Sequence, residues 1–353
     1  MEFALESFEM VRFFLLTALA FVVAMVATPP FLRFLHHYKL GKTIRDKETA
    51  PVFVSLHAKK AGTPTMGGIL IWGTVLFLIL FFFVLSILFP NASISKFNFL
   101  SRSETLLPLG ALIASAFVGL IDDYLNIRGI GSHAGGLRAR YRLMLYFLIA
   151  CFGAWWFSVK LDWDILHIPF WGDVSLGFFY IPFFILVIVA TSFSVNNTDG
   201  LDGLAGSSLV TSFGAFAIIA FTQGRYDLAI FCGAILGALL AFLWFNIHPA
   251  KFFMGDTGAM SLGVTLGIVA LLTNTALLLP IIGIIFVAES ASIILQIGFR
   301  KQFKRKLFRS APFHHHLEAI GCPEPQIVMR FWLISMVAAA LGVSLALLDA
   351  LRV

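Results

Sequence analysis

The sequence predicts an all-α polytopic integral membrane protein with about ten transmembrane helices, forming a single domain over residues 1–353. Two observations support this fold class. The chain is 59% hydrophobic and only 12% charged, which lies outside the usual composition of soluble globular domains. Its apolar residues also form long runs without the alternation of β-strands, and helices satisfy every backbone hydrogen bond inside a lipid bilayer.

The transmembrane helices are predicted from apolar stretches, since crossing the bilayer takes about 20 helical residues. Ten stretches are long enough, or nearly so with tilt, and they cover residues 11–31, 66–89, 106–121, 141–158, 178–195, 206–222, 227–244, 258–273, 276–298 and 329–350. The first lacks the basic start of a cleaved signal peptide, so we expect it to remain as the first helix.

Basic residues between the stretches predict their orientation. Lys and Arg concentrate in alternate connections, at residues 33–60, 128–142, 251 and 300–330. Connections rich in Lys and Arg stay in the cytoplasm, so these are expected to be cytoplasmic and both termini periplasmic. This placement explains the net charge of +6 as a membrane signal, and we expect no nucleic-acid binding.

Polar motifs gather on the same predicted cytoplasmic side. The central motif runs from Asn196 to Gly206 between two apolar stretches and contains Asp199 and Asp202. Charged groups beside hydrocarbon are costly unless they are paired, hydrated or bound to an ion. We therefore expect this run to form part of an active site at the membrane surface.

Two more acidic motifs lie on that side. Asp122 and Asp123 end the third stretch, and adjacent carboxylates favour a nearby metal ion or basic group. Asp256 lies near the amino end of the eighth stretch, where a helix can bind Mg²⁺ and phosphate together with glycine-rich backbone. Taken singly, the first pair could be a solvated helix end and Asp256 an ordinary helix cap.

Asn246 and Phe253 precede Asp256 in the same polar run, and Phe253 could stack on a base. Lys60 lies just before a glycine-rich turn at residues 62–68. A lysine there suits a diphosphate or an anionic lipid headgroup, although marking of the cytoplasmic side explains it equally well. Glu289 and Gln296 lie in the ninth stretch, where a polar side chain faces a cavity or bridges helices.

A run of histidines follows the basic cluster at residues 300–309; it consists of His314, His315 and His316. Consecutive side chains cannot all point one way on a helix, and zinc ligands are usually spaced along the chain. We therefore expect these histidines to contact anions rather than to form a mononuclear zinc site. A solvated polar loop is the alternative.

The combination predicts phosphoryl transfer, with acids for Mg²⁺, basic residues for phosphates, and an acid or base for the proton. A transporter would place its ionisable residues near the middle of its helices and often show repeated halves. The charges here cluster at one side and no repeat is visible in the sequence. A structural membrane protein would leave the aspartates unexplained.

In their order along the chain, these motifs resemble those of the polyprenyl-phosphate hexose-1-phosphate transferases. Within that superfamily, residues 62–68, 311–318 and 323–325 are similar to the phospho-N-acetylmuramoyl-pentapeptide transferases. The histidine motif distinguishes this branch from the alternative, the N-acetylglucosamine-1-phosphate transferases.

The resemblance implies a bacterial inner-membrane enzyme, often a homodimer, with ten helices. It would move phospho-MurNAc-pentapeptide from UDP-MurNAc-pentapeptide to undecaprenyl phosphate, giving lipid I and UMP with Mg²⁺. A single displacement is favoured over a covalent phospho-enzyme.

The resemblance also implies roles for individual residues. Asp256 would bind Mg²⁺, Asp122 would be the base for the lipid phosphate, and Asp123 would complete the acidic centre. The nucleoside pocket would be lined by Asn196, Asp199, Asp202, Asn246 and Phe253. Phosphate or the sugar-peptide part would be bound by Lys60, His314, His315 and His316, with His315 in a catalytic role and Gln296 nearby.

Three positions depart from the family pattern. Arg142 stands where the family usually has lysine, so a planar guanidinium group replaces the compact ammonium group of lysine. Asn197 stands where an apolar residue is usual. The segment 48–56 is longer and more apolar than the family's short polar loop, and we expect it to pack on the membrane surface.

Overall fold

A computed structural model describes residues 2–41, 60, 62–131 and 135–352. The segment 48–56, predicted to pack on the membrane surface, lies outside these residues. The long helices are α1 (Glu2–His37), α3 (Gly68–Leu88), α4 (Leu106–Ile127), α5 (Ala139–Trp155), α6 (Tyr180–Thr198), α7 (Leu204–Thr222), α8 (Tyr226–Asn246), α9 (Gly255–Leu272), α11 (Ile284–Phe303) and α13 (Glu324–Ala350). The short helices are α10 (Leu279–Ile282) and α12 (Phe313–Ala319), and short 3₁₀ turns cover Ser93–Phe97, Gly177–Phe179 and Ala276–Leu278. A π-helical turn, Trp156–Lys160, continues α5.

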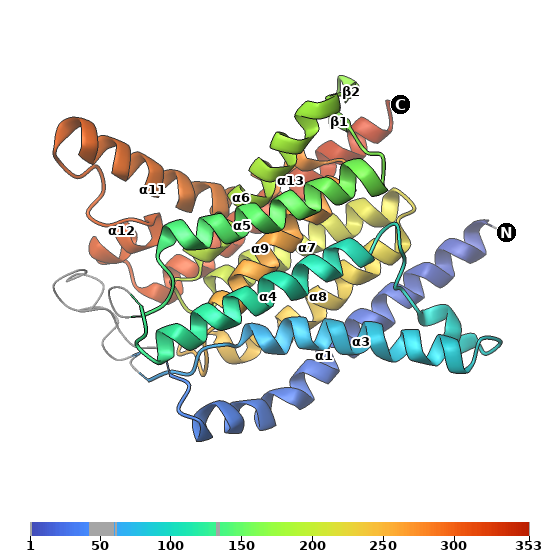
Figure 1. Ribbon diagram of the computed structural model, residues 1–353, viewed down its shortest axis with the longest axis horizontal. Helices are drawn as coiled ribbons and strands as arrows, with labels where there is room; N and C mark the ends of the chain where they lie inside the picture. Colours follow the sequence, from blue (N-terminus) through green and yellow to red (C-terminus); the bar gives the residue numbers. More distant parts are fainter. Residues whose placement is uncertain (1, 42–59, 61, 132–134, 353) are drawn as a thin grey trace.

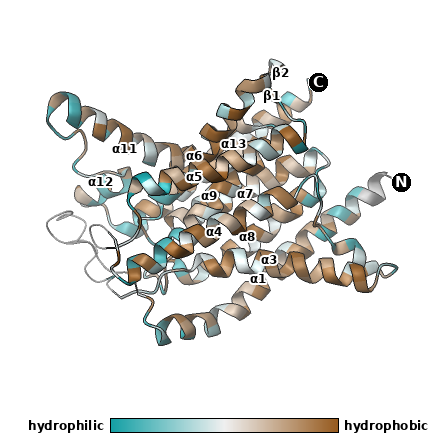
Figure 2. Ribbon diagram, in the orientation of Figure 1, coloured by the Kyte–Doolittle hydropathy of each residue, from teal (hydrophilic) through white to brown (hydrophobic). Residues whose placement is uncertain are grey.

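The helical prediction is confirmed at this level. Within the described residues, nine helices are long and apolar enough to cross a membrane, and one bent pair brings the number to ten if it counts as one span. Figure 2 shows apolar residues along the bundle and hydrophilic residues mostly towards its ends. Figure 1 places both chain termini at one end of the bundle, away from α12.

The ninth predicted stretch, residues 276–298, is not one straight helix. The segments Ala276–Ile282 and Ile284–Phe303 meet at an angle of 84° around Gly283. Helix α10 packs against α13, whereas α11 packs against α6, so the two segments follow different neighbours. Figure 1 shows the far end of α11 projecting away from the bundle. Hydropathy alone cannot reveal such a bend, because it is the same for straight and bent helices.

A small β-hairpin corrects the all-α prediction. Strand β1 (Ile165–Ile168) pairs antiparallel with β2 (Gly172–Ser175). The side chain of His167 joins the hairpin to α13, because its Nδ1 lies 2.6 Å from Asp173 Oδ1 in β2 and its Nε2 contacts Asp349 near the end of α13. The backbone N–H of His167 also donates to Asn274 at 3.0 Å. Strands this short carry too little alternation to be seen in the sequence.

The hairpin contact should depend on pH. Burial opposes protonation of His167, but hydrogen bonds to Asp173 and Asp349 outweigh it and raise the pKa of the imidazole. Both ring nitrogens can donate only when the ring is protonated. A raised pKa stabilises the fold below the ordinary histidine pKa of about 6.5, and this contribution is lost as pH rises through the folded-state pKa.

We therefore expect the thermal midpoint of the wild-type protein to fall more steeply between about pH 6.5 and 9 than that of His167→Asn. Thermal unfolding in detergent across this range measures both slopes. Equal slopes in the two proteins would contradict a protonated His167.

The core is organised around α9, which is buried along nearly its whole length and packs against α3, α4 and α6. Small residues permit this approach. A Cβ atom added to Gly68 at the start of α3 would lie 2.2 Å from Cα of Gly258 in α9. Because α9 begins at Gly255, this packing fixes the position of Asp256 in its first turn.

Gly68→Ala should force α3 away from α9 and lower the free energy of unfolding by about 1–3 kcal/mol, as overpacking usually does. The matched control is Gly73→Ala on the same helix, where an added Cβ meets nothing within 4 Å. The thermal midpoints of both variants in detergent measure the difference. The packing argument fails if the two variants unfold at the same temperature.

Candidate active site

An acidic centre forms where four helices meet. Asp122 and Asp123 lie in the last two turns of α4, Asn196 in the last turn of α6, Asp256 in the first turn of α9, and Arg142 in the first turn of α5. The structure thus brings together two acidic motifs that lie 133 residues apart in the chain. Asp122 and Asp123 are buried, whereas Asp256 remains partly exposed.

Asp123 holds the start of α9. Its carboxylate oxygens accept hydrogen bonds from the backbone N–H groups of Asp256 at 3.1 Å and Thr257 at 3.0 Å. These groups have no partner inside their own helix, and a carboxylate also complements the positive end of the helix dipole. Asp123 therefore positions Asp256. The sequence had predicted only that Asp123 belongs to the acidic centre, not that it caps α9.

Asp256 faces the other polar groups of the centre. Its Oδ1 accepts a hydrogen bond from Asn196 Nδ2 at 2.5 Å, and the guanidinium of Arg142 lies 3.4 Å away. Arg142 also reaches Asn196 Oδ1 at 3.3 Å and Asp122 Oδ2 at 3.5 Å. The planar fork of Arg142 thus contacts three residues of the centre at once.

The charges of the centre favour a hard cation. Among the described residues, three carboxylates, Asp122, Asp123 and Asp256, interact with the guanidinium of Arg142. Asp122 Oδ1 is further held by the N–H of Leu137 at 2.5 Å. Carboxylate oxygens are the ligands that Mg²⁺ prefers, and the partly exposed Asp256 is the most accessible of them. The donor set is therefore chemically suited to Mg²⁺, and the role predicted for Asp256 stays a prediction.

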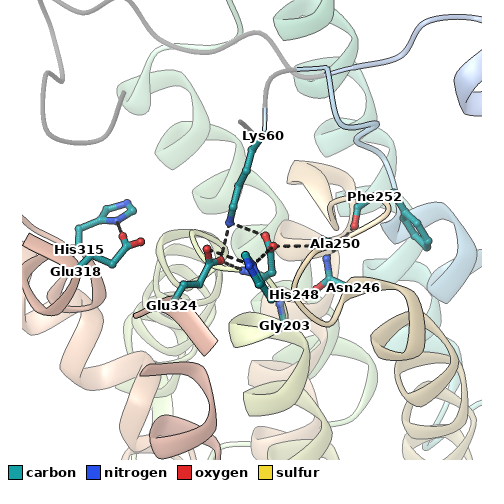
Figure 3. Close-up of polar contacts among 10 residues, drawn as sticks. Lys60, Gly203, Asn246, His248, Ala250, Phe252, His315, Glu318 and Glu324 are labelled. Atoms are coloured by element: carbon teal, nitrogen blue, oxygen red, sulfur yellow. Dashed lines mark hydrogen bonds and ion pairs between the residues drawn. The ribbon is translucent and has the colours of Figure 1, made fainter. Parts of the chain in front are cut away.

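A second polar cluster joins four separate segments (Figure 3). Lys60 Nζ lies 2.6 Å from Asp202 Oδ1 and 2.5 Å from Glu324 Oε1 at the start of α13. His248 Nδ1 lies 2.9 Å from Asp202 Oδ2, which also accepts the N–H of Ala250 at 3.2 Å. We call Lys60, Asp202, His248 and Glu324 the lysine cluster.

The lysine cluster contains three groups that could act as metal ligands. Oxygen or nitrogen atoms of Asp202, His248 and Glu324 lie within 4.8 Å of one another. However, the Lys60 ammonium already contacts both carboxylates. The Lys60 ammonium therefore already offsets part of the negative charge of this cluster.

Asn246 and Phe253 support the same region. Asn246 accepts the N–H of Gly203 at 2.9 Å and donates to Phe252 O at 2.8 Å, so it joins the α6–α7 turn to the α8–α9 connection. The ring centroid of Phe253 lies 6.0 Å from Lys60 Nζ. Asp199 ends α6, three residues before Asp202.

The histidine run forms part of α12, so the alternative of a polar loop is wrong. Its three side chains have different surroundings, as expected. His314 is buried, and its Nδ1 lies 2.9 Å from Glu289 Oε2 on α11. The Nδ1 of His315 lies 2.7 Å from Glu318 Oε2. The Nδ1 of His316 accepts a hydrogen bond from the backbone N–H of Arg309 at 3.2 Å.

His314 also adjoins the central polar motif. A Cβ on Gly200 would lie 2.3 Å from its Nε2. Among the described residues this buried nitrogen has no hydrogen-bond partner. Gln296 instead holds the basic connection, because its Oε1 accepts the N–H groups of Leu307 at 3.0 Å and Phe308 at 2.9 Å.

An apolar cavity of about 170 Å³ lies between α6 and the bent segment. It is lined by residues of α6, α9, α10 and α11, including Leu186, Ala190, Leu266, Pro280 and Phe286. Ser194, two residues before the site residue Asn196 on α6, also borders it. An apolar cavity bounded by a helix that carries Asn196 suits a hydrocarbon chain.

Comparisons with known proteins show the family to which the chain belongs. Residues 105–274 match the model of glycosyl transferase family 4, and residues 60–71 match phospho-N-acetylmuramoyl-pentapeptide-transferase signature 1. A relative named phospho-N-acetylmuramoyl-pentapeptide-transferase, from Chloroflexus aurantiacus, is 41% identical over 96% of this chain and 91% of its own. The chain belongs to the phospho-N-acetylmuramoyl-pentapeptide-transferase family. A Geobacillus relative of the same name is 39% identical over 92% of this chain and 95% of its own.

The matched regions include the acidic centre and three of the four residues of the lysine cluster. The phospho-N-acetylmuramoyl-pentapeptide-transferase signature begins at Lys60, and the glycosyl transferase match contains Asp122, Asp202 and Asp256. Glu289, Glu324 and the histidines lie outside both matches but inside the alignment with the Chloroflexus relative, which covers 96% of the chain.

Sequence reasoning gave no role in this phospho-N-acetylmuramoyl-pentapeptide-transferase site to Glu324 or His248, and it named Glu289 without its partner. Glu324 and His248 complete the lysine cluster, and Glu289 binds His314. A buried glutamate within an apolar stretch is a signal for Glu289. Glu324 lies between two prolines at the start of a helix, which gives no chemical signal without its partners.

Proposed function

We propose that this chain transfers phospho-MurNAc-pentapeptide from UDP-MurNAc-pentapeptide to undecaprenyl phosphate in a single displacement, forming lipid I and UMP. The family assignment supports the substrates and the reaction. The observation that carries the proposal is the acidic centre, where Asp122, Asp256, Asn196 and Arg142 meet. Attack of one phosphate on another needs such a centre, because anions must approach each other.

The residues of the centre divide this work. Asp256 and the neighbouring oxygen donors would hold Mg²⁺, which when bound would neutralise charge that develops on the phosphates. Arg142 contributes a fixed positive charge between Asp122 and Asp256. Asp122 would accept the proton of the lipid phosphate, and Asp123 would hold α9 in place through its two backbone contacts.

The remaining site residues suit the donor substrate. Lys60, Asp202 and Asn246 surround the α6–α7 turn, and Phe253 offers an aromatic face for the base. Asn196 and Asp199, on the last residues of α6 and just beyond it, lie between the nucleoside side and the acidic centre. The free Nε2 of His314 faces this turn, while His315, His316 and Gln296 would serve the sugar-peptide side.

The apolar cavity beside α6 suits the acceptor. Its walls are hydrocarbon, and α6 connects it to Asn196 and the acidic centre. A segment of the polyprenyl chain would lie in this cavity, which at about 170 Å³ is too small for the whole chain. The proposal also includes a cytoplasmic active site, periplasmic termini, a bacterial inner membrane and a homodimer.

The test is transfer from labelled UDP-MurNAc-pentapeptide to undecaprenyl phosphate in detergent. We expect lipid-linked product and UMP with Mg²⁺, and loss of both with EDTA, because removing the cation leaves the anions unscreened. Returning Mg²⁺ should restore turnover. Without acceptor, no label should stay on the protein, since a single displacement forms no covalent intermediate.

UDP-N-acetylglucosamine serves as the control donor. If the protein used this donor in place of UDP-MurNAc-pentapeptide, its activity would be that of an N-acetylglucosamine-1-phosphate transferase, which would contradict the proposal. A labelled protein in the absence of acceptor would overturn the single displacement alone.

A further inference from the structure

We propose that Glu324 is a positioning residue of the donor site, which holds Lys60 and the Asp202 turn in the geometry that receives the UDP part of the substrate. This inference rests on the proposed function and deepens it. It assigns a role to Glu324, the first residue of α13.

One oxygen atom of Glu324 joins two chain segments. Oε1 lies 2.5 Å from Lys60 Nζ and accepts the backbone N–H of Asp202 at 2.7 Å (Figure 3). The second oxygen, Oε2, lies 3.5 Å from His248 Nδ1. Glu324 therefore contacts every other member of the lysine cluster.

The burial of these groups makes the contacts strong. The side chains of Glu324 and Asp202 are 10% and 3% exposed, and that of Lys60 is 19% exposed. Hydrogen bonds to charged groups in such surroundings are about twice as strong as neutral ones. Without Glu324, the Lys60 side chain would keep only Asp202 among these carboxylates, and the Asp202 N–H would lose its acceptor.

The arrangement places Glu324 behind Lys60 rather than in contact with the substrate. Lys60 and Asp202 belong to the proposed nucleoside and diphosphate side, and Phe253 lies beside Lys60. A lysine that is already held in place loses less side-chain freedom when it binds an anion. Glu324 should therefore act on donor binding, through Lys60, and leave acceptor binding unchanged.

The experiment measures the steady-state kinetics of the full-length protein in detergent for wild type and Glu324→Gln. Glutamine keeps an oxygen acceptor for Asp202 but removes the charge that holds Lys60. We expect the KM for UDP-MurNAc-pentapeptide to rise on the order of 10-fold. The KM for undecaprenyl phosphate should stay within about twofold, with kcat nearly unchanged.

A double-mutant cycle tests whether Glu324 acts through Lys60. In a Lys60→Ala background, Glu324→Gln should change the donor KM by less than about twofold, because the residue it positions is already absent. Asp349→Asn is the matched control, since it removes an ion pair at the other end of the same helix, beside His167. It should leave the donor KM unchanged.

Three results would overturn the inference: an unchanged donor KM in Glu324→Gln, a lower donor KM, or an equal loss for both substrates. A lower KM would mean that Glu324 competes with the substrate for Lys60. Binding of UMP, followed by calorimetry without turnover, separates this question from the proposed function. Wild-type protein that binds UMP but makes no lipid I would contradict the function, whereas weaker UMP binding by Glu324→Gln would still support the positioning role.

Discussion

Asp256→Asn should lower the turnover number by on the order of 10³-fold, since removal of a group that stabilises developing charge costs about this much. The carboxylate of Asp256 is the most accessible in the acidic centre, and Asn196 and Arg142 already orient it. An asparagine of nearly the same shape keeps the fold but loses the charge needed to hold a divalent cation. Product formation with increasing Mg²⁺ measures the loss.

Asp164→Asn is the control for this substitution. Asp164 accepts a hydrogen bond from Ser175 at 2.6 Å in the connection that carries the β-hairpin, at the end of the bundle away from α12. Its removal should leave turnover unchanged. If well-folded Asp256→Asn kept wild-type turnover and Mg²⁺ dependence, the cation would have to lie elsewhere, and Asp202, His248 and Glu324 would be the next group to test.

Glu289→Ala should lower the free energy of unfolding by about 3–5 kcal/mol, the usual cost of breaking a buried pair. Glu289 and His314 are both almost completely buried. Glu289 accepts hydrogen bonds from the backbone N–H of His314 at 3.2 Å and lies 2.9 Å from its Nδ1. Its removal leaves two buried polar groups without partners and frees α12 from α11.

The matched variant is Glu289→Gln, which keeps an acceptor oxygen of nearly the same shape. It should lose less than half as much stability as Glu289→Ala. Fluorescence-monitored thermal unfolding in the same detergent gives both values. Equal midpoints for wild type and Glu289→Ala would mean that the pair does not hold α12 to α11.

Most of the fold could be predicted from hydropathy. Residues 204–222 and 226–246 are helices close to the predicted stretches 206–222 and 227–244. The first helix, by contrast, extends well beyond residues 11–31 on both sides, because polar residues at its ends continue the same backbone hydrogen bonding. The bend at Gly283 and the β-hairpin depend on neighbouring helices, so no local pattern revealed them.

The candidate site was predicted in part for a similar reason. Asp122 and Asp256 could be named because carboxylates next to apolar helices are costly and therefore informative. Their contact with Arg142, and the capping of α9 by Asp123, required the packed helices. Glu324 was noted only as part of the motif at residues 323–325, and its role required the structure, because its partner Lys60 lies 264 residues away in the chain.

The sequence by itself determined the membrane class, the helical architecture and the family resemblance. These follow from local properties: the length of apolar runs, the cost of charge beside hydrocarbon, and the order of short motifs along the chain. Only the tertiary structure decided which polar side chains share a centre, which carboxylate caps α9, and which glutamates hold Lys60 and His314. Contacts between distant segments decide these features, since hydrogen bonds and ion pairs depend on distances that helix packing sets.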